Sequence, residues 1–136
     1  MDTDAVVAAM RSPSGASAAL LRAARAGRAA LLATVPLCLE YEGVCSRPEH
    51  VAAAGFGPED VTVFLDAVVD LVEPVEVWFL WRPQLRDPGD ELVLEAAVNG
   101  RAAAIATFNR RDFSPAAARF GVEVLLPAEA VRRLPA

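Results

Sequence analysis

Short runs of apolar residues alternate along this chain with longer stretches in which apolar residues recur every three or four positions. A short run bounded by glycine, proline or polar residues predicts a buried strand, and the longer periodic stretches predict amphipathic helices. The predicted strands are 30–34, 74–79, 102–107 and 122–126. Buried strands alternating with helices predict an α/β fold, in which helices cover both faces of a parallel sheet.

The helical stretches are bounded by residues that favour helix ends. Pro36 and Pro58 suit the first turn of a helix, and Gly27 suits a helix end. The predicted helices cover 3–10, 16–26, 36–45, 49–54, 59–72, 91–98 and 127–134. The segment 80–90 carries two prolines and a glycine, so we expect it to be mostly loop. No repeat or interdomain linker interrupts the pattern, which predicts a single domain over 1–136.

Composition narrows the class of protein. The chain has 136 residues, and a hydrophobic fraction of 54% excludes a disordered chain. No apolar run reaches the roughly 18 residues that span a bilayer. The N-terminus lacks the basic and apolar regions of a signal peptide, so we expect a cytoplasmic protein. The net charge of −5 argues against a nucleic-acid coat protein but not against a nuclease whose acidic cleft binds metal.

The two cysteines do not indicate a metal site. Cys38 and Cys45 are seven residues apart in a helical pattern, which places them on one face. We expect both to be reduced and packed in the helix interface, since two cysteines and one histidine do not give a recognisable zinc spacing.

Acidic residues at the edges of apolar segments are the candidate functional residues. Ligands of parallel α/β sheets bind at the carboxyl ends of the strands. The acids expected near that edge are Glu40, Asp90 and Asp112, and Asp2 is a further acid at the edge of an apolar segment. Such carboxylates repel one another unless a cation lies between them, and Mg²⁺ prefers carboxylate and water oxygens.

Each of these acids also has an ordinary structural interpretation. Asp90 could cap a helix, Glu40 could lie on a solvated helix face, and Asp112 could close an Asx-turn. Residue type and spacing alone leave these alternatives open.

Four segments resemble, in order along nearly the whole chain, those of PIN-domain proteins. They are 2–28, LCLEYEGVCSRPEH (37–50), 85–113 and VEVLLPAEAV (122–131). The most specific is 85–113, which contains Arg-Asp-Pro-x-Asp and then Thr-Phe-Asn-x-x-Asp-Phe. The likeness is greatest to VapC-like ribonuclease toxins of bacterial type II toxin–antitoxin modules.

The resemblance implies a three-layer α/β/α sandwich with a four- or five-stranded parallel sheet. It also implies a Mg²⁺- or Mn²⁺-dependent endoribonuclease. Carried over by position, the metal-binding and catalytic acids would be Asp2, Glu40, Asp90 and Asp112. Thr107 and Asn109 match the Thr-x-Asp/Asn position beside the metal.

Three arginines are candidates for holding the phosphates that flank the cleaved bond, although ordinary surface or ion-pair roles are equally open. They are Arg86, Arg110 and Arg111.

Two positions depart from the family pattern. Asp4 stands where the family usually has asparagine. Only Met1 precedes Asp2, where the family has a central apolar strand, so we expect the first strand to be truncated.

The resemblance also implies partners. RNA would be the substrate, an antitoxin protein the cognate partner and a homodimer the assembly, with no membrane. Two other functions stay open, namely an inactive PIN-like module that binds protein and a housekeeping RNA-processing nuclease.

Overall fold

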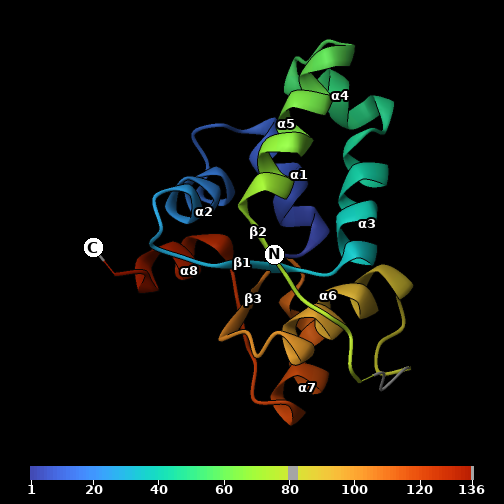
Figure 1. The fold of residues 1–136 in the computed structure, drawn as a ribbon, viewed down its shortest axis with the longest axis vertical. Coiled ribbons are helices and arrows are strands. Elements are labelled where there is room, and N and C mark those ends of the chain that lie inside the picture. The colour runs from blue at the N-terminus through green and yellow to red at the C-terminus, as the bar shows by residue number, and fades with distance from the viewer. Residues whose placement is uncertain (80–82, 136) are drawn as a thin grey trace.

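The computed structural model describes residues 1–79 and 83–135, and Figure 1 shows the arrangement of the elements. The helices are α1 (Thr3–Arg11), α2 (Ala16–Arg25), α3 (Val35–Cys45), α4 (Pro48–Ala54), α5 (Pro58–Leu71), α6 (Pro88–Asn99), α7 (Arg110–Arg119) and α8 (Pro127–Arg133). The strands are β1 (Leu31–Ala33), β2 (Val72–Pro74), β3 (Ala104–Ala106) and β4 (Glu123–Leu125). Helices and short parallel strands together confirm an α/β protein.

The strands form two separate parallel pairs. β1 pairs with β2, with Leu31 opposite Val72, and β3 pairs with β4, with Ile105 opposite Val124. Within residues 1–79 and 83–135 the pairs are not joined, so the single four- or five-stranded sheet expected above is not found. The Asp2 amide donates to the Ala106 carbonyl at 2.9 Å, which places the start of the chain at the β3 edge.

An apolar pocket of about 460 Å³ is lined by both strand pairs, and we call it the inter-sheet pocket. Its lining includes Met1, Leu31 and Leu32 of β1, and Ala104 and Ile105 of β3. No described strand crosses it. The inter-sheet pocket therefore lies between β1 and β3, and a strand placed there would join the two pairs.

One predicted strand is mostly not a strand in the structure. The alternating residues 74–79 were expected to form a strand, but β2 ends at Pro74. The Trp78 and Phe79 amides instead both donate to Asn99 Oδ1, at 2.9 Å each. The Asn99 side chain thus takes the place of a neighbouring strand as the hydrogen-bond acceptor.

Two helices also differ from expectation. Helix α7 was not predicted, because its sequence RRDFSPAAAR is polar at its start and contains Pro115. Helix α6 begins at Pro88, inside the expected loop, because the Asp87 side chain accepts from the Gly89 amide and caps the helix. Residues 80–82 of that expected loop lie outside the described residues.

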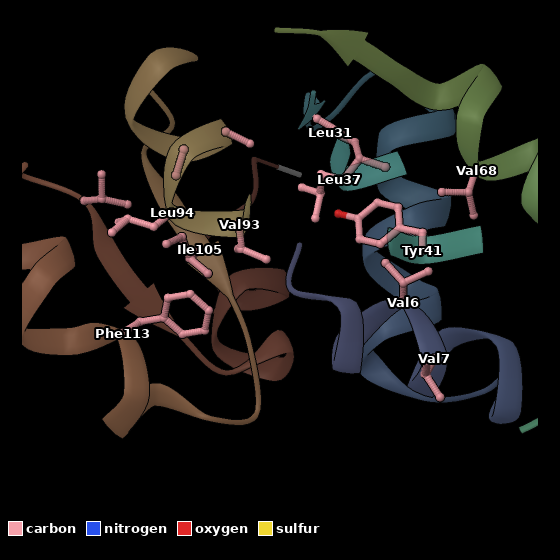
Figure 2. Packing of buried hydrophobic residues seen from close by; sticks show 14 of the residues in the cluster. Val6, Val7, Leu31, Leu37, Tyr41, Val68, Val93, Leu94, Ile105 and Phe113 are labelled. Carbon is pink, nitrogen blue, oxygen red and sulfur yellow. The ribbon is translucent and has the colours of Figure 1, made fainter. Parts of the chain in front are cut away.

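The hydrophobic core extends across both strand pairs. Figure 2 shows Ile105 and Phe113 on one side and Val6 and Tyr41 on the other, and all four are buried. Cys45 is buried as expected, whereas Cys38 is only half-buried, and both are free thiols. Within the described residues, no helix has the length and apolar character needed to cross a membrane.

Candidate functional site

Most of the predicted acids border one open groove of about 810 Å³, which we call the acidic groove. Three helices contribute stripes of residues to it. Helix α1 contributes Asp4, Val7, Ala8 and Arg11; α3 contributes Glu40 and Val44; α4 contributes His50 and Ala53, with Arg47 just before it. Asp2, Thr3, Ser12, Asp87, Gly89, Asp90 and Asn109 complete the lining. The helical spacing of these stripes explains how residues of unlike chemistry face the same space.

Asp2 is the most firmly held acid of the groove. It is buried and caps α1, with Oδ1 accepting from the Thr3 amide at 2.7 Å. Its other oxygen, Oδ2, accepts from the Thr107 hydroxyl at 2.6 Å. Thr107 follows β3 directly and is fully buried, so the end of this strand fixes the orientation of the Asp2 carboxylate.

Thr107 and Asn109 lie beside Asp2 and Asp4 respectively. The Thr107 hydroxyl oxygen also accepts from the Asn109 amide at 2.9 Å. The Asn109 side chain then donates through Nδ2 to Asp4 Oδ2 at 3.1 Å, and the Phe108 amide donates to the same oxygen at 3.1 Å. The turn after β3 therefore holds two carboxylates that come from the start of α1.

Asp4 is a site residue whose role the sequence left open. Burial, followed by repulsion from the Asp2 carboxylate, raises the pKa of Asp4 to about 7. Its Oδ1 atom is buried and has no hydrogen-bond partner in the described part of the chain. A carboxylate in this position lacks a donor for one oxygen, which a proton or a cation would satisfy.

Asp90 and Glu40 approach the groove from different helices. Burial raises the pKa of Asp90 to about 7, with added repulsion from Asp2, Asp87, Asp112 and Glu40 in that order. A Cβ built on Gly89 would lie 3.0 Å from Glu40 Oε1, so the first turn of α6 directly faces the Glu40 carboxylate. The interpretation of Asp90 as the cap does not hold, since Asp87 is the cap of α6, and both Asp90 and Glu40 line the groove.

Asp112 and the three candidate arginines are less central. Asp112 is exposed in the first turn of α7 and is not among the lining residues, although its charge reaches Asp90. Arg110 pairs with Glu129 at 3.0 Å, so its guanidinium is directed to α8. Arg86 and Arg111 are exposed and lie outside the groove lining. The structure therefore does not bring these three arginines into the groove.

Arg11, Arg47 and His50 line the groove, and sequence reasoning missed all three. The signal that could have found Arg11 is the spacing of Asp4, Ala8 and Arg11, which places them on one face of a helix. Arg47 and His50 are three residues apart and face the groove from the start and first turn of α4.

Tyr41 ties the start of the chain to α3. Its buried hydroxyl donates a hydrogen bond to the Met1 carbonyl. Because Glu40 precedes Tyr41 and Asp2 follows Met1, this bond joins the segments that carry two of the groove acids. Burial also lowers the pKa of the Met1 α-amino group.

The groove suits a hard divalent cation by the chemistry of its donors. Carboxylate oxygens are what Mg²⁺ and Mn²⁺ prefer, and the unpartnered Asp4 Oδ1 and the crowded Asp90 carboxyl are places where positive charge would relieve repulsion. Among the described residues, however, no three acidic, histidine or cysteine side chains are grouped closely enough to hold a metal. The donors are therefore present on one groove but not gathered into a coordination shell.

Comparison with known proteins gave one match. Neither the curated proteins nor the solved structures showed a match to the chain. A family model described as PIN domain matches residues 1–111, which include Asp2, Glu40, Asp90 and Thr107. PIN domains are generally nucleases that use divalent metal ions. With the matched segment covering most of its length, the chain belongs to the PIN domain family.

Proposed function

We propose that this chain is a Mg²⁺- or Mn²⁺-dependent endoribonuclease that hydrolyses RNA phosphodiester bonds. The observation that carries the proposal is the convergence of Asp2, Asp4, Glu40 and Asp90, from three separate helices, on one open groove. Repulsion among carboxylates makes such a groove costly in the absence of a cation. The membership of a nuclease family supports the same conclusion.

The residues that would hold the metal are Asp2, Glu40 and Asp90, with Asp112 at the border of the site. A divalent cation supplies a bound water of lowered pKa and neutralises developing charge on the phosphate. The Thr107 hydroxyl donates a hydrogen bond to the Asp2 carboxylate and so fixes its orientation. Asn109 holds Asp4 beside Asp2, so the two acids at the start of α1 act as one unit.

A cleavage assay tests the proposal. Labelled single-stranded RNA should be cut in Mg²⁺ or Mn²⁺ and left intact in EDTA. Asp90→Asn should lower kcat/KM by at least about 100-fold, since even changes to residues that only orient metal ligands cost 10- to 100-fold. Asp70→Asn, an exposed substitution on α5 outside the groove, is the matched control and should cleave normally. Equal activity of Asp90→Asn and Asp70→Asn would contradict the assignment.

The biological role we propose is that of the toxin in a toxin–antitoxin pair. The support is the resemblance of the chain to that group. Exposed apolar residues on α3 and α5, including Leu39 and Val63, offer a surface for an antitoxin or a second copy of the chain. Toxicity on expression, relieved by a small protein encoded beside it, distinguishes a toxin from a housekeeping RNA-processing nuclease.

A second candidate function is an inactive PIN-like module that binds protein. The observation that favours it is the lack, among the described residues, of three possible ligands grouped for a metal. Calorimetric titration with Mn²⁺ separates the candidates. The nuclease should bind Mn²⁺ and lose that binding in Asp90→Asn, whereas an inactive module should show no heat assignable to the acidic groove.

A further inference from the structure

The acidic groove has a basic end that none of the proposed metal ligands occupies. Arg11 closes α1, and Arg47 immediately precedes α4. Both side chains are exposed and line the groove. Figure 1 shows α4 beyond the end of α3, on the side of the molecule away from α6, where Asp90 lies.

The two guanidinium groups are available for a ligand. In the described part of the chain, neither Arg11 nor Arg47 forms an ion pair or a side-chain hydrogen bond. This differs from Arg110, which is paired with Glu129, and from Arg22, which donates to the Pro13 carbonyl at 2.7 Å. The N–H donors of both guanidinium groups can therefore bind an anionic group in the groove.

His50 adds a third polar group at the same end. Its Nδ1 atom is buried and has no hydrogen-bond partner among the described residues. A buried ring nitrogen without a partner costs free energy unless something satisfies it. His50 lines the groove together with Arg47, three residues before it on the same helical face.

The spacing along α1 separates the two ends of the groove. Asp4 and Arg11 are seven residues apart on one helix, a rise of about 10 Å at 1.5 Å per residue. One phosphate group cannot contact both residues over that distance. A ligand that uses both ends must therefore be extended and carry more than one anionic group.

We infer that Arg11, Arg47 and His50 form a subsite for a phosphate of single-stranded RNA next to the bond that is cleaved. The inference rests on the proposed function and assigns the direction in which the bound RNA strand extends from the acidic residues. Arginine recognises phosphate by paired N–H donors, and His50 can complete the hydrogen bonding to a phosphate or ribose oxygen. The phosphate lies at this end because carboxylates repel it elsewhere in the groove.

The test measures RNA binding apart from cleavage. Fluorescence anisotropy of a labelled single strand of about 12 nucleotides, in EDTA, reports affinity without turnover. The double variant Arg11→Gln/Arg47→Gln should bind RNA at least tenfold more weakly. Its slope of log affinity against log salt should fall by about 0.7 for each phosphate that an arginine no longer neutralises. Arg28→Gln/Arg132→Gln removes the same charge from exposed positions outside the groove and is the matched control.

A cleavage assay on the same variants separates this inference from the proposed function. If RNA is cut, the groove variant should raise KM by about the loss in affinity and leave Mn²⁺ binding by calorimetry unchanged. Normal cleavage with unchanged KM and salt slope would overturn the subsite and leave the nuclease assignment intact. Weakened RNA binding with no cleavage by any form would support a phosphate site at these three residues but overturn the nuclease and the place of the site beside a cleaved bond. Equal weakening by the control pair, or equal competition by polyglutamate, would overturn the inference in favour of general charge attraction.

Discussion

At the scale of single residues, the acidic groove combines a fixed carboxylate with two that are costly to ionise. Asp2 has donors for both oxygens, whereas Asp4 has a buried oxygen without one in the described part of the chain. Asp4 and Asp90 both have a pKa of about 7, raised chiefly by burial. These two groups therefore change charge near neutral pH, where free aspartate is fully ionised.

The raised pKa values predict how stability depends on pH in metal-free protein. Asp4 and Asp90 hold protons more tightly in the folded state than in the unfolded chain, where their pKa is 3.8. Between about pH 4 and pH 7 the folded state binds more protons, so their contribution to the free energy of unfolding falls as pH rises. In EDTA, the wild-type Tm should drop across this interval by more than that of Asp4→Asn/Asp90→Asn.

Comparison with a control isolates the two carboxyls. Asp66→Asn/Asp70→Asn changes the same number of charges on exposed positions of α5 and should keep the wild-type pH dependence. The buried Met1 amine acts in the opposite sense, because its lowered pKa makes stability rise as it loses its proton, and it is common to all variants. Identical slopes for the wild type and the groove variant would contradict the prediction.

At the scale of elements, the first turn of α6 sets the position of the Glu40 carboxylate. Gly89 lies in that turn, and a Cβ there would be 3.0 Å from Glu40 Oε1 and 3.1 Å from Asp87 Oδ1. Those distances are tighter than normal van der Waals contact, so the Glu40 side chain must move. Glycine at this position thus permits α6 and α3 to bring their acids together.

Gly89→Ala should separate metal binding from stability. Alanine suits a helical turn better than glycine, so the Tm should change little, while Mn²⁺ affinity should fall by about tenfold or more as Glu40 is displaced. Gly43→Ala on α3 is the matched control, because a Cβ there meets nothing within 4 Å. That substitution should raise stability by about 0.5–1 kcal/mol and leave Mn²⁺ affinity unchanged. Equal Mn²⁺ affinity in both variants would contradict the role given to Gly89.

Sequence reasoning predicted the elements that local pattern determines. The three apolar runs that contain β1, β3 and β4 are strands, and each is a short segment between helices. The run 74–79 has the same alternation, yet its amides bind Asn99, a partner 20 and 21 residues away that no local pattern reveals. Helix α7 was missed because its stability comes from burying Phe113 and Ala117 rather than from its polar sequence.

The candidate site was predictable to a similar degree. Asp2, Glu40, Asp90, Thr107 and Asn109 were selected from motif resemblance, and all lie at or beside the groove. The spacing along α1 places Arg11 on the same helix face as Asp4, but Arg47 was missed because its place depends on how α4 packs against α1. For Arg110 the structure shows the ion-pair alternative that was left open, with Glu129 of α8 as its partner.

At the scale of the whole molecule, the inter-sheet pocket is the main departure from a continuous core. In a parallel strand the N–H and C=O of one residue point to the same edge, and those of the next residue point to the opposite edge. The Ala33 carbonyl accepts from the Val75 amide, so the N–H and C=O of Leu32 face away from β2. On β3 the Ala106 carbonyl accepts from the Asp2 amide, so the end of that strand edge is paired. A volume of about 460 Å³ is roughly three times that of an engineered cavity, about 150 Å³, that holds benzene.

An added strand should therefore stabilise the protein. Joining about five residues of the type Val-Ile-Val-Leu-Val to the Met1 nitrogen would place apolar side chains in the inter-sheet pocket. Each fully buried side chain contributes about 1.5–3 kcal/mol, against about 1–2 kcal/mol to order each residue. With hydrogen bonds to both strand edges, we expect a rise in Tm of at least about 5 °C.

A matched extension tests whether the inter-sheet pocket is responsible. A Gly-Ser extension of the same length should leave the Tm unchanged, since it buries no apolar surface. A second apolar extension, in a chain carrying Ala104→Glu to place charge in the lining, should lose the gain. Stabilisation by the apolar extension that survives Ala104→Glu would show that it binds somewhere else.

The hydrogen bond from Tyr41 to the Met1 carbonyl has a consequence for how the molecule opens. Chain ends normally fray, and their amides exchange with solvent hydrogen long before those of the core. Here the first residues are held by the middle of α3 and by the end of β3. The amides of Val6 and Val7 should therefore exchange as slowly as those of α3, and the N-terminus should be among the last parts of this protein to come loose.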